Sequence, residues 1–204
     1  MKKISLTLGM VVFGLMVACQ QPENKEEPSA QNEQKESWQL LGYESKAAYG
    51  EHLVLIGGCD DCHSPKVMGP QGPEVNKDLR LSGHPANEPA PDINRQEIES
   101  KFMAACNPGL TAWVGPWGVS FAANITSDAT GIGNWSEEQF KRAMQEGKLK
   151  GMPEGRMLLP PMPWPALSHM TDDEISSIFE YLKSIPAINN VAPTPLPPLA
   201  AMAQ

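Results

Sequence analysis

Basic tracts, internal repeats and long apolar runs are all missing from this chain of 204 residues. Acidic residues outnumber basic ones by 24 to 16, and the resulting net charge of −8 argues against nucleic acid as a partner. A partner steered by charge would instead present a basic or mixed face. The 20 prolines and 17 glycines favour long irregular stretches over a regular helical bundle.

Cysteine is also scarce, with only Cys19, Cys59, Cys62 and Cys106 in the whole chain. A structural zinc site needs four ligands, and neither a second C-x-x-C nor a suitably spaced histidine pair is present. A thioredoxin-like dithiol is expected at a helix start in a βαβ unit, and the sequence shows no such pattern. Cys106 has no evident partner, so we expect either a buried, inert thiol or a disulfide with another protein.

The first 18 residues have the features of an export signal. Lys2 and Lys3 precede an apolar run that ends near Val17, which is shorter than the about 20 residues of a membrane span. Met16-Val17-Ala18-Cys19 resembles the lipobox of bacterial lipoproteins, in which the cysteine is acylated. We therefore expect a lipidated Cys19 that tethers the protein to a membrane, facing the periplasm; the alternative is an uncleaved helical anchor.

The rest of the chain divides into a polar linker (19–37), a folded domain (38–190) and a proline-rich tail (191–204), which is extended over the surface or free. Within the domain, three segments have both an apolar face at helical spacing and a capping residue, which is Ser45, Ser136 or Thr171. A fourth segment is less regular, and two others are rich in proline and glycine. The expected helices are 46–56, 94–105, one from 136 to Gly147 and one from 171 to just before Pro186; the expected loops are 64–91 and 148–170, and an extended stretch runs from 110 to 125.

Cys59-Asp60-Asp61-Cys62-His63 is a C-x-x-C-H motif, the attachment signature of c-type haem. Two thiols at this spacing can add to the two vinyl groups on one edge of a porphyrin. The next residue, His63, then lies under the iron and can bind it as the proximal ligand. One motif predicts one covalent haem.

An electron carrier needs a second axial ligand, usually His or Met. Of the remaining histidines, we expect His52 in the core, His84 in a loop and His169 near the surface. Among the methionines, Met103 and Met144 are expected in the core. Met162 lies in Leu-Pro-Pro-Met-Pro-Trp-Pro, where the flanking prolines stiffen the loop, and it is the first candidate. Met157 and Met152 are the alternatives.

The order of these features resembles a class I cytochrome c over roughly residues 43–188. The resemblance implies a mainly α cytochrome c fold, with helices around one haem and long Pro/Gly-rich loops, and with Met162 as the second iron ligand. It also implies that the first and last helices cross at close range, with Gly50 facing Tyr181. The segments 81–87 and 124–135 are similar to cytochrome subunits of bacterial periplasmic dehydrogenases, which often carry two or three haems. In such subunits a residue placed like Trp135 lies near the haem, where it can donate its indole N–H to a propionate or simply fill the core.

These features predict an electron-transfer protein rather than an enzyme, working between membrane-associated or periplasmic redox partners such as a dehydrogenase or respiratory complex. The first alternative is a peroxidase-like haem enzyme, although bacterial examples usually have two c-type haems. The second is a gas-binding haem sensor, which requires weak or absent methionine ligation. The sequence does not separate a mobile carrier from a fixed subunit.

Overall fold

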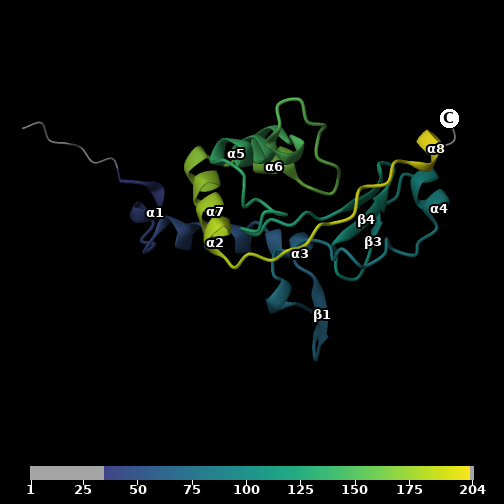
Figure 1. Ribbon diagram of the computed structural model, residues 1–204, viewed down its shortest axis with the longest axis horizontal. Helices are drawn as coiled ribbons and strands as arrows, with labels where there is room; N and C mark the ends of the chain where they lie inside the picture. Colours follow the sequence, from purple (N-terminus) through teal and green to yellow (C-terminus); the bar gives the residue numbers. More distant parts are fainter. Residues whose placement is uncertain (1–34, 203–204) are drawn as a thin grey trace, which may run out of the picture. The chain divides into compact units, whose positions relative to one another are not determined.

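The computed structural model describes residues 35–202, which contain eight α-helices, two short 3-10 helices and five strands (Figure 1). The mainly helical prediction is therefore confirmed, with two small sheets added to it. The α-helices are α1 (Ser37–Leu40), α2 (Lys46–Ile56), α3 (Cys59–His63), α4 (Arg95–Ser100), α5 (Glu137–Glu146), α6 (Trp164–Leu167), α7 (Asp172–Ser184) and α8 (Leu199–Met202). The strands are β1 (Lys66–Gly69), β2 (Gly72–Val75), β3 (Ala105–Cys106), β4 (Ala112–Gly115) and β5 (Gly118–Phe121).

The predicted signal peptide, the lipidation site Cys19 and most of the predicted linker lie outside the described residues. Between residues 35 and 202, no helix combines the length and the apolar character that crossing a bilayer requires.

The three well-capped helices begin at the predicted residues. The Ser45 hydroxyl accepts a hydrogen bond from the backbone N–H of Ala48 at the start of α2. Ser136 and Thr171 form complete capping boxes at the starts of α5 and α7. Because a cap satisfies backbone N–H groups that the first helical turn leaves unpaired, it fixes where the helix begins.

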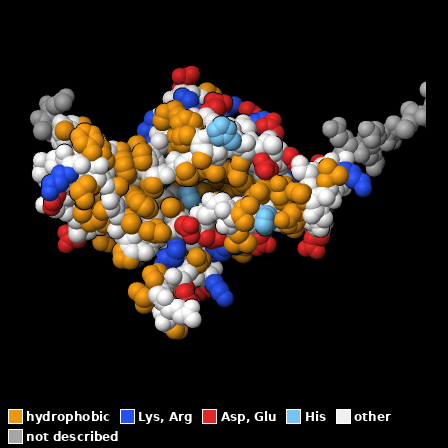
Figure 2. Space-filling view, turned by 180° about the vertical axis from the view of Figure 1, so that it is seen from behind, with side chains coloured by type: hydrophobic (Ala, Val, Ile, Leu, Met, Phe, Trp, Pro, Cys, Tyr) orange, Lys and Arg blue, Asp and Glu red, His pale blue; other side chains and the backbone are white. Residues whose placement is uncertain are grey.

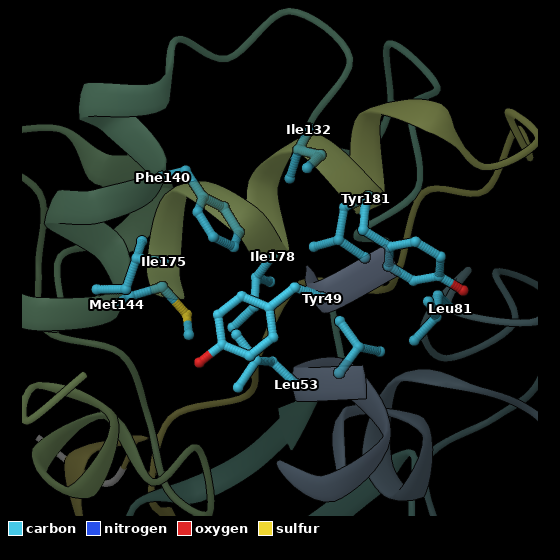
Figure 3. Close-up of a cluster of buried hydrophobic side chains, with 11 residues drawn as sticks. Tyr49, Leu53, Leu81, Ile132, Phe140, Met144, Ile175, Ile178 and Tyr181 are labelled. Atoms are coloured by element: carbon cyan, nitrogen blue, oxygen red, sulfur yellow. The ribbon is translucent and has the colours of Figure 1, made fainter. Parts of the chain in front are cut away.

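Helices α2 and α7 cross at close range, as the resemblance to class I cytochromes c implies. A Cβ atom on Gly50 would lie only 1.9 Å from the carbonyl oxygen of Ser177 and 2.9 Å from the Cβ of Tyr181. Only glycine lets the two backbones approach this closely. Around the crossing lies the main hydrophobic core (Figure 3), formed by Tyr49, Leu53, Val54, Leu81, Ile132, Phe140, Met144, Ile175, Ile178, Tyr181 and Leu182.

The predicted loop 64–91 contains an antiparallel hairpin, in which β1 pairs with β2 and Gly69 lies opposite Gly72. The predicted helix 94–105 is shorter than expected, because α4 ends at Ser100 and β3 begins at Ala105. The predicted extended stretch 110–125 is a second hairpin, β4–β5, which β3 joins in a three-stranded sheet. In both hairpins the residues of the turn allow the chain to reverse its direction. The hydrophobic periodicity of the sequence does not by itself reveal such a turn.

The C-terminal segment lies along this second sheet. The backbone of Leu196 pairs with that of Val119 on β5, with N···O distances of 2.9 and 3.0 Å. Arg95 on α4 donates to the carbonyl of Pro197, and Glu99 accepts from the N–H of Leu199. These contacts fix the outer edge of the sheet.

Two expectations about single residues were wrong. His52 is exposed and lies beside the Tyr43 ring, because it occupies the outer face of α2. Met103 follows the end of α4 and is exposed, because the helix is too short to carry it into the core. His84 lies in a loop, as expected, and is fully buried there, with one ring nitrogen 2.8 Å from the Thr111 hydroxyl.

Candidate functional site

The C-x-x-C-H motif forms its own single-turn helix, α3. Gly57 ends α2, and Gly58 then takes a left-handed conformation (φ +66°) that redirects the chain into α3. Residues three apart on a helix lie on the same side, so Cys59 and Cys62 share one face of α3. Cys59, Cys62 and Cys106 are all free thiols in the part of the chain that the structure describes.

The two motif thiols have the wrong acidity for thiol–disulfide chemistry. Burial, together with the charge of neighbouring Asp60, raises the pKa of the Cys59 thiol to about 11. Burial and the charge of Asp61 also raise the pKa of Cys62. Catalytic dithiols need a thiolate and therefore a lowered pKa. The local electrostatics thus argue against a redox-active dithiol here.

His63 is held at both its ring and its backbone. Its Nδ1 lies 2.7 Å from the carbonyl oxygen of Ala123. Because a carbonyl can only accept, Nδ1 must carry the proton, and the lone pair of Nε2 is free to bind a metal. Burial lowers the pKa of His63, which favours the neutral ring that a metal ligand requires. The backbone carbonyl of His63 accepts a hydrogen bond from Gly83 at 2.7 Å.

The acceptor carbonyl of Ala123 is positioned by the segment that contains Gly83. Gly83 has a φ of +80°, and a Cβ there would lie 2.5 Å from the carbonyl carbon of Ala123. The neighbouring N–H of His84 donates to the carbonyl of Ala122 at 2.9 Å, and Ala122 in turn donates to Thr111 at 2.8 Å. The second sheet therefore sets the position of the group that orients His63.

Asp60, inside the motif, ties α3 to the helix crossing. Arg80 donates two hydrogen bonds to its carboxylate, from Nε at 2.9 Å and from Nη2 at 2.7 Å. Arg80 also donates to the Tyr181 hydroxyl, which contacts Glu51 on α2. The fully buried Ser64 hydroxyl donates to the same carboxylate at 2.7 Å. The network connects the motif to both α2 and α7.

Lys66 caps the other end of α3. Its ammonium donates to the backbone carbonyls of Asp60, Asp61 and Ser64 at the C-terminal end of α3. A positive charge at a helix C-terminus is favourable because it faces the negative end of the helix dipole. The side chain therefore fixes the exit of the chain from the motif.

Met162 lies beside the main core together with two other predicted site residues. Cys59, Trp135 and Met162 are each partly buried and pack against the core cluster. The loop before Met162 is held by the Ser120 hydroxyl on β5, which donates to the carbonyl of Pro160 at 2.6 Å. Met152 and Met157 are more exposed, at 50% and 41%. Of the three candidate methionines, Met162 is the one in contact with the core.

The indole N–H of Trp135 has no hydrogen-bond acceptor among residues 35–202, although the backbone of Trp135 is fixed by a bond to Ile132. The exposed His169 lies at the surface, as expected from its sequence position.

Figure 2 shows hydrophobic side chains gathered around a hollow on one face, with histidines among them. Within residues 35–202, no cluster of three or more His, Cys, Asp or Glu side chains could hold a metal ion.

Several cytochrome subunits of dehydrogenases are similar to this chain in sequence. The alcohol dehydrogenase (quinone) cytochrome c subunit of Gluconobacter oxydans is 33% identical over 171 residues, which are 79% of this chain and 30% of that subunit. The gluconate 2-dehydrogenase cytochrome c subunit of Pantoea cypripedii is 33% identical over 133 residues, 65% of this chain and 21% of that subunit. The chain is similar to cytochrome c subunits of dehydrogenases. This similarity supports a place in the cytochrome c family.

A third relative is the fructose dehydrogenase cytochrome subunit of Gluconobacter japonicus, 34% identical over 85 residues, which are 41% of this chain and 16% of that subunit. The chain thus spans less than a third of the length of these three relatives. No family model matches the chain.

A c-type haem fits the residues that the structure brings together. Two free thiols share one face of α3, and the Nε2 of His63 is left without its proton by the bond to Ala123. The side chains of Cys59, Trp135 and Met162 are partly buried and pack against the same hydrophobic core, which would supply the apolar contacts that a porphyrin needs. Sequence reasoning missed Gly83 and Ala123, because their roles depend on backbone groups.

Proposed function

We propose that this chain is an electron-transfer protein with one covalent c-type haem, attached through Cys59 and Cys62 and ligated by His63. The observation that carries the proposal is the hydrogen bond from Nδ1 of His63 to the carbonyl of Ala123, within a C-x-x-C-H helix. Metal-binding histidines generally donate their other ring nitrogen to such an acceptor, which fixes the ring and raises its basicity. The similarity to cytochrome c subunits supports the same function.

Met162 is the proposed second axial ligand, which makes this a mono-haem, class I type of cytochrome. When bound, the haem iron alternates between its ferric and ferrous forms and so carries one electron. The chain's own residues keep the site rigid: the bond from Ser120 to Pro160 holds the Met162 loop, and the Arg80–Asp60 pair holds α3. The free indole N–H of Trp135 is a suitable donor to a haem propionate.

We further propose a dehydrogenase as the redox partner, with this chain as its electron-transfer protein rather than its catalytic subunit. The dehydrogenase subunits among its relatives support this role. A lipid on Cys19 would anchor the chain to a membrane in the cell envelope, facing the periplasm. Such an anchor would concentrate the haem domain near membrane-bound partners.

Attachment and function can be tested together on protein matured with haem. We expect a mass increase of one haem and a reversible one-electron potentiometric titration. Replacing either Cys59 or Cys62 by serine should abolish double thioether attachment, whereas Cys106→Ser should leave it intact. Loss of attachment in Cys106→Ser alone, or a protein that takes up no haem, would contradict the proposal.

The peroxidase and gas-sensor alternatives both require an open iron site, and the relatives described above give neither any support. Carbon monoxide added to the ferrous protein distinguishes them from the carrier. We expect no rapid binding to the wild type and rapid binding to Met162→Ala. Rapid binding to the wild type would favour the sensor or the enzyme.

A further inference from the structure

The β1–β2 hairpin projects from the rest of the described structure (Figure 1). It is a sheet of only two strands, and such hairpins gain little stability of their own. Two apolar side chains on β1 nevertheless face solvent, Val67 at 48% and Met68 at 79% exposure. The hairpin begins only three residues after His63, so these side chains lie close in sequence to the haem motif.

A second exposed apolar pair lies on the other side of the motif. Leu55 and Ile56 form the last turn of α2, and their exposures are 58% and 67%. Leu55 lines a groove together with Val75 of β2, and Gly58 and Asp60 also line it. The groove therefore passes beside the start of α3 and has apolar side chains in its lining.

The rim of this groove is acidic. Asp61 and Glu74 line it, are exposed and make no ion pair with any other residue of the described chain. Asp60 is already neutralised by Arg80 at 2.7 Å. The remaining cation at the groove is the exposed Lys77. Two free carboxylates against one ammonium leave the groove with a net negative charge beside its apolar side chains.

We infer that this groove, bounded by the β1–β2 hairpin and the end of α2, is the docking surface for a protein redox partner with lysine or arginine side chains around an apolar patch. The inference rests on the proposed electron-transfer function. An interface here would bring the partner within a few residues of the haem-attachment helix. Acidic rim charges would speed encounter with a basic partner, and the exposed apolar pairs would lose water on contact.

The test measures electron transfer from the ferrous, haem-loaded protein to two oxidants by stopped-flow spectroscopy. The first oxidant is ferric mitochondrial-type cytochrome c, a basic protein with lysines around an apolar patch. The second is ferricyanide, which is too small to need a docking surface. The variants are Met68→Ser and Glu74→Gln, and each has a matched control near α4, Met103→Ser and Asp92→Asn respectively.

We expect Met68→Ser and Glu74→Gln each to slow transfer to the protein oxidant by about threefold or more at low ionic strength, while the controls change it little. For Glu74→Gln the difference should vanish at high ionic strength, since salt screens the rim charge. All variants should react equally with ferricyanide. Equal rates for hairpin and control variants with the protein oxidant would overturn the docking inference. A wild type that exchanges no electrons with ferricyanide would instead contradict the proposed function itself.

Discussion

Replacing Gly83 by alanine would disturb the contact that orients His63 without changing a residue that touches the haem. The added Cβ would lie 2.5 Å from the carbonyl carbon of Ala123, whereas ordinary contacts begin near 3.4 Å. Relief of this contact requires a displacement of about 0.9 Å. A matching movement of the Ala123 carbonyl would lengthen its 2.7 Å distance to His63 Nδ1 to about 3.6 Å, beyond hydrogen-bonding range.

The expected energetic effects are of two kinds. Loss of the hydrogen bond makes the imidazole a weaker donor to iron and so destabilises the ferric form, by about 1 kcal/mol. For one electron this corresponds to a rise in reduction potential of about 40 mV. The left-handed φ of +80° and the close contact together cost about 3 kcal/mol of folding free energy. In a domain of this size the melting temperature should fall by about 6–12 °C.

The assay is potentiometric titration of the haem-loaded protein, together with thermal unfolding followed by circular dichroism. Gly72→Ala is the matched control, because Gly72 also has a positive φ (+122°) but nothing lies within 4 Å of its added Cβ. The control should lose some stability and keep its potential. A folded Gly83→Ala protein with the wild-type potential would refute the role given to Ala123.

Three further predictions concern the rest of the fold. Gly50→Ala should lower the free energy of unfolding by about 2 kcal/mol, because overpacking at the α2–α7 crossing outweighs the gain in helix propensity. Gly109→Ala is the control and should not lower it, because its added Cβ would have no contact under 3.6 Å. Chemical denaturation checks both. Arg80→Met should cost about 2 kcal/mol in the same assay, since it leaves the carboxylate of the haem motif without its charged donors; no loss would mean that the pair is dispensable. The ammonium of Lys141 lowers the pKa of Asp172 in the folded protein. The pair therefore stabilises the fold fully at pH values above the usual carboxyl pKa of about 3.9, and this stabilisation is lost as the pH falls through the lowered pKa of Asp172. Lys141→Met should therefore flatten the acid side of the stability profile, and an unchanged profile would count against the assignment.

The helices were the part of the fold most open to prediction. Ser45, Ser136 and Thr171 were recognised as caps, and each side chain accepts the expected backbone hydrogen bond. These signals are local, since the cap and the backbone N–H that donates to it lie three residues apart. Proline and glycine concealed the β1–β2 hairpin, because the residues that allow its turn also suggest irregular structure.

The candidate site was predictable only where side chains carry the chemistry. The motif indicated Cys59, Cys62 and His63, and stiff flanking prolines indicated Met162. The carbonyl of Ala123 gave no signal, because every residue has one and only the tertiary fold selects it. The expectation that His52 lies in the core was wrong for a related reason. The Tyr43 ring packs beside it on the outside of α2, and the helical period alone does not reveal this contact.

The most direct test of the central claim is the absorption spectrum of the haem-loaded protein in both redox states. The wild type should be low-spin, with a weak long-wavelength sulfur-to-iron band in the ferric form. Met162→Ala should lose that band and become high-spin, while Met152→Ala and Met157→Ala should keep it. A band that survives in Met162→Ala, or a wild type that is already high-spin, would contradict ligation by His63 and Met162.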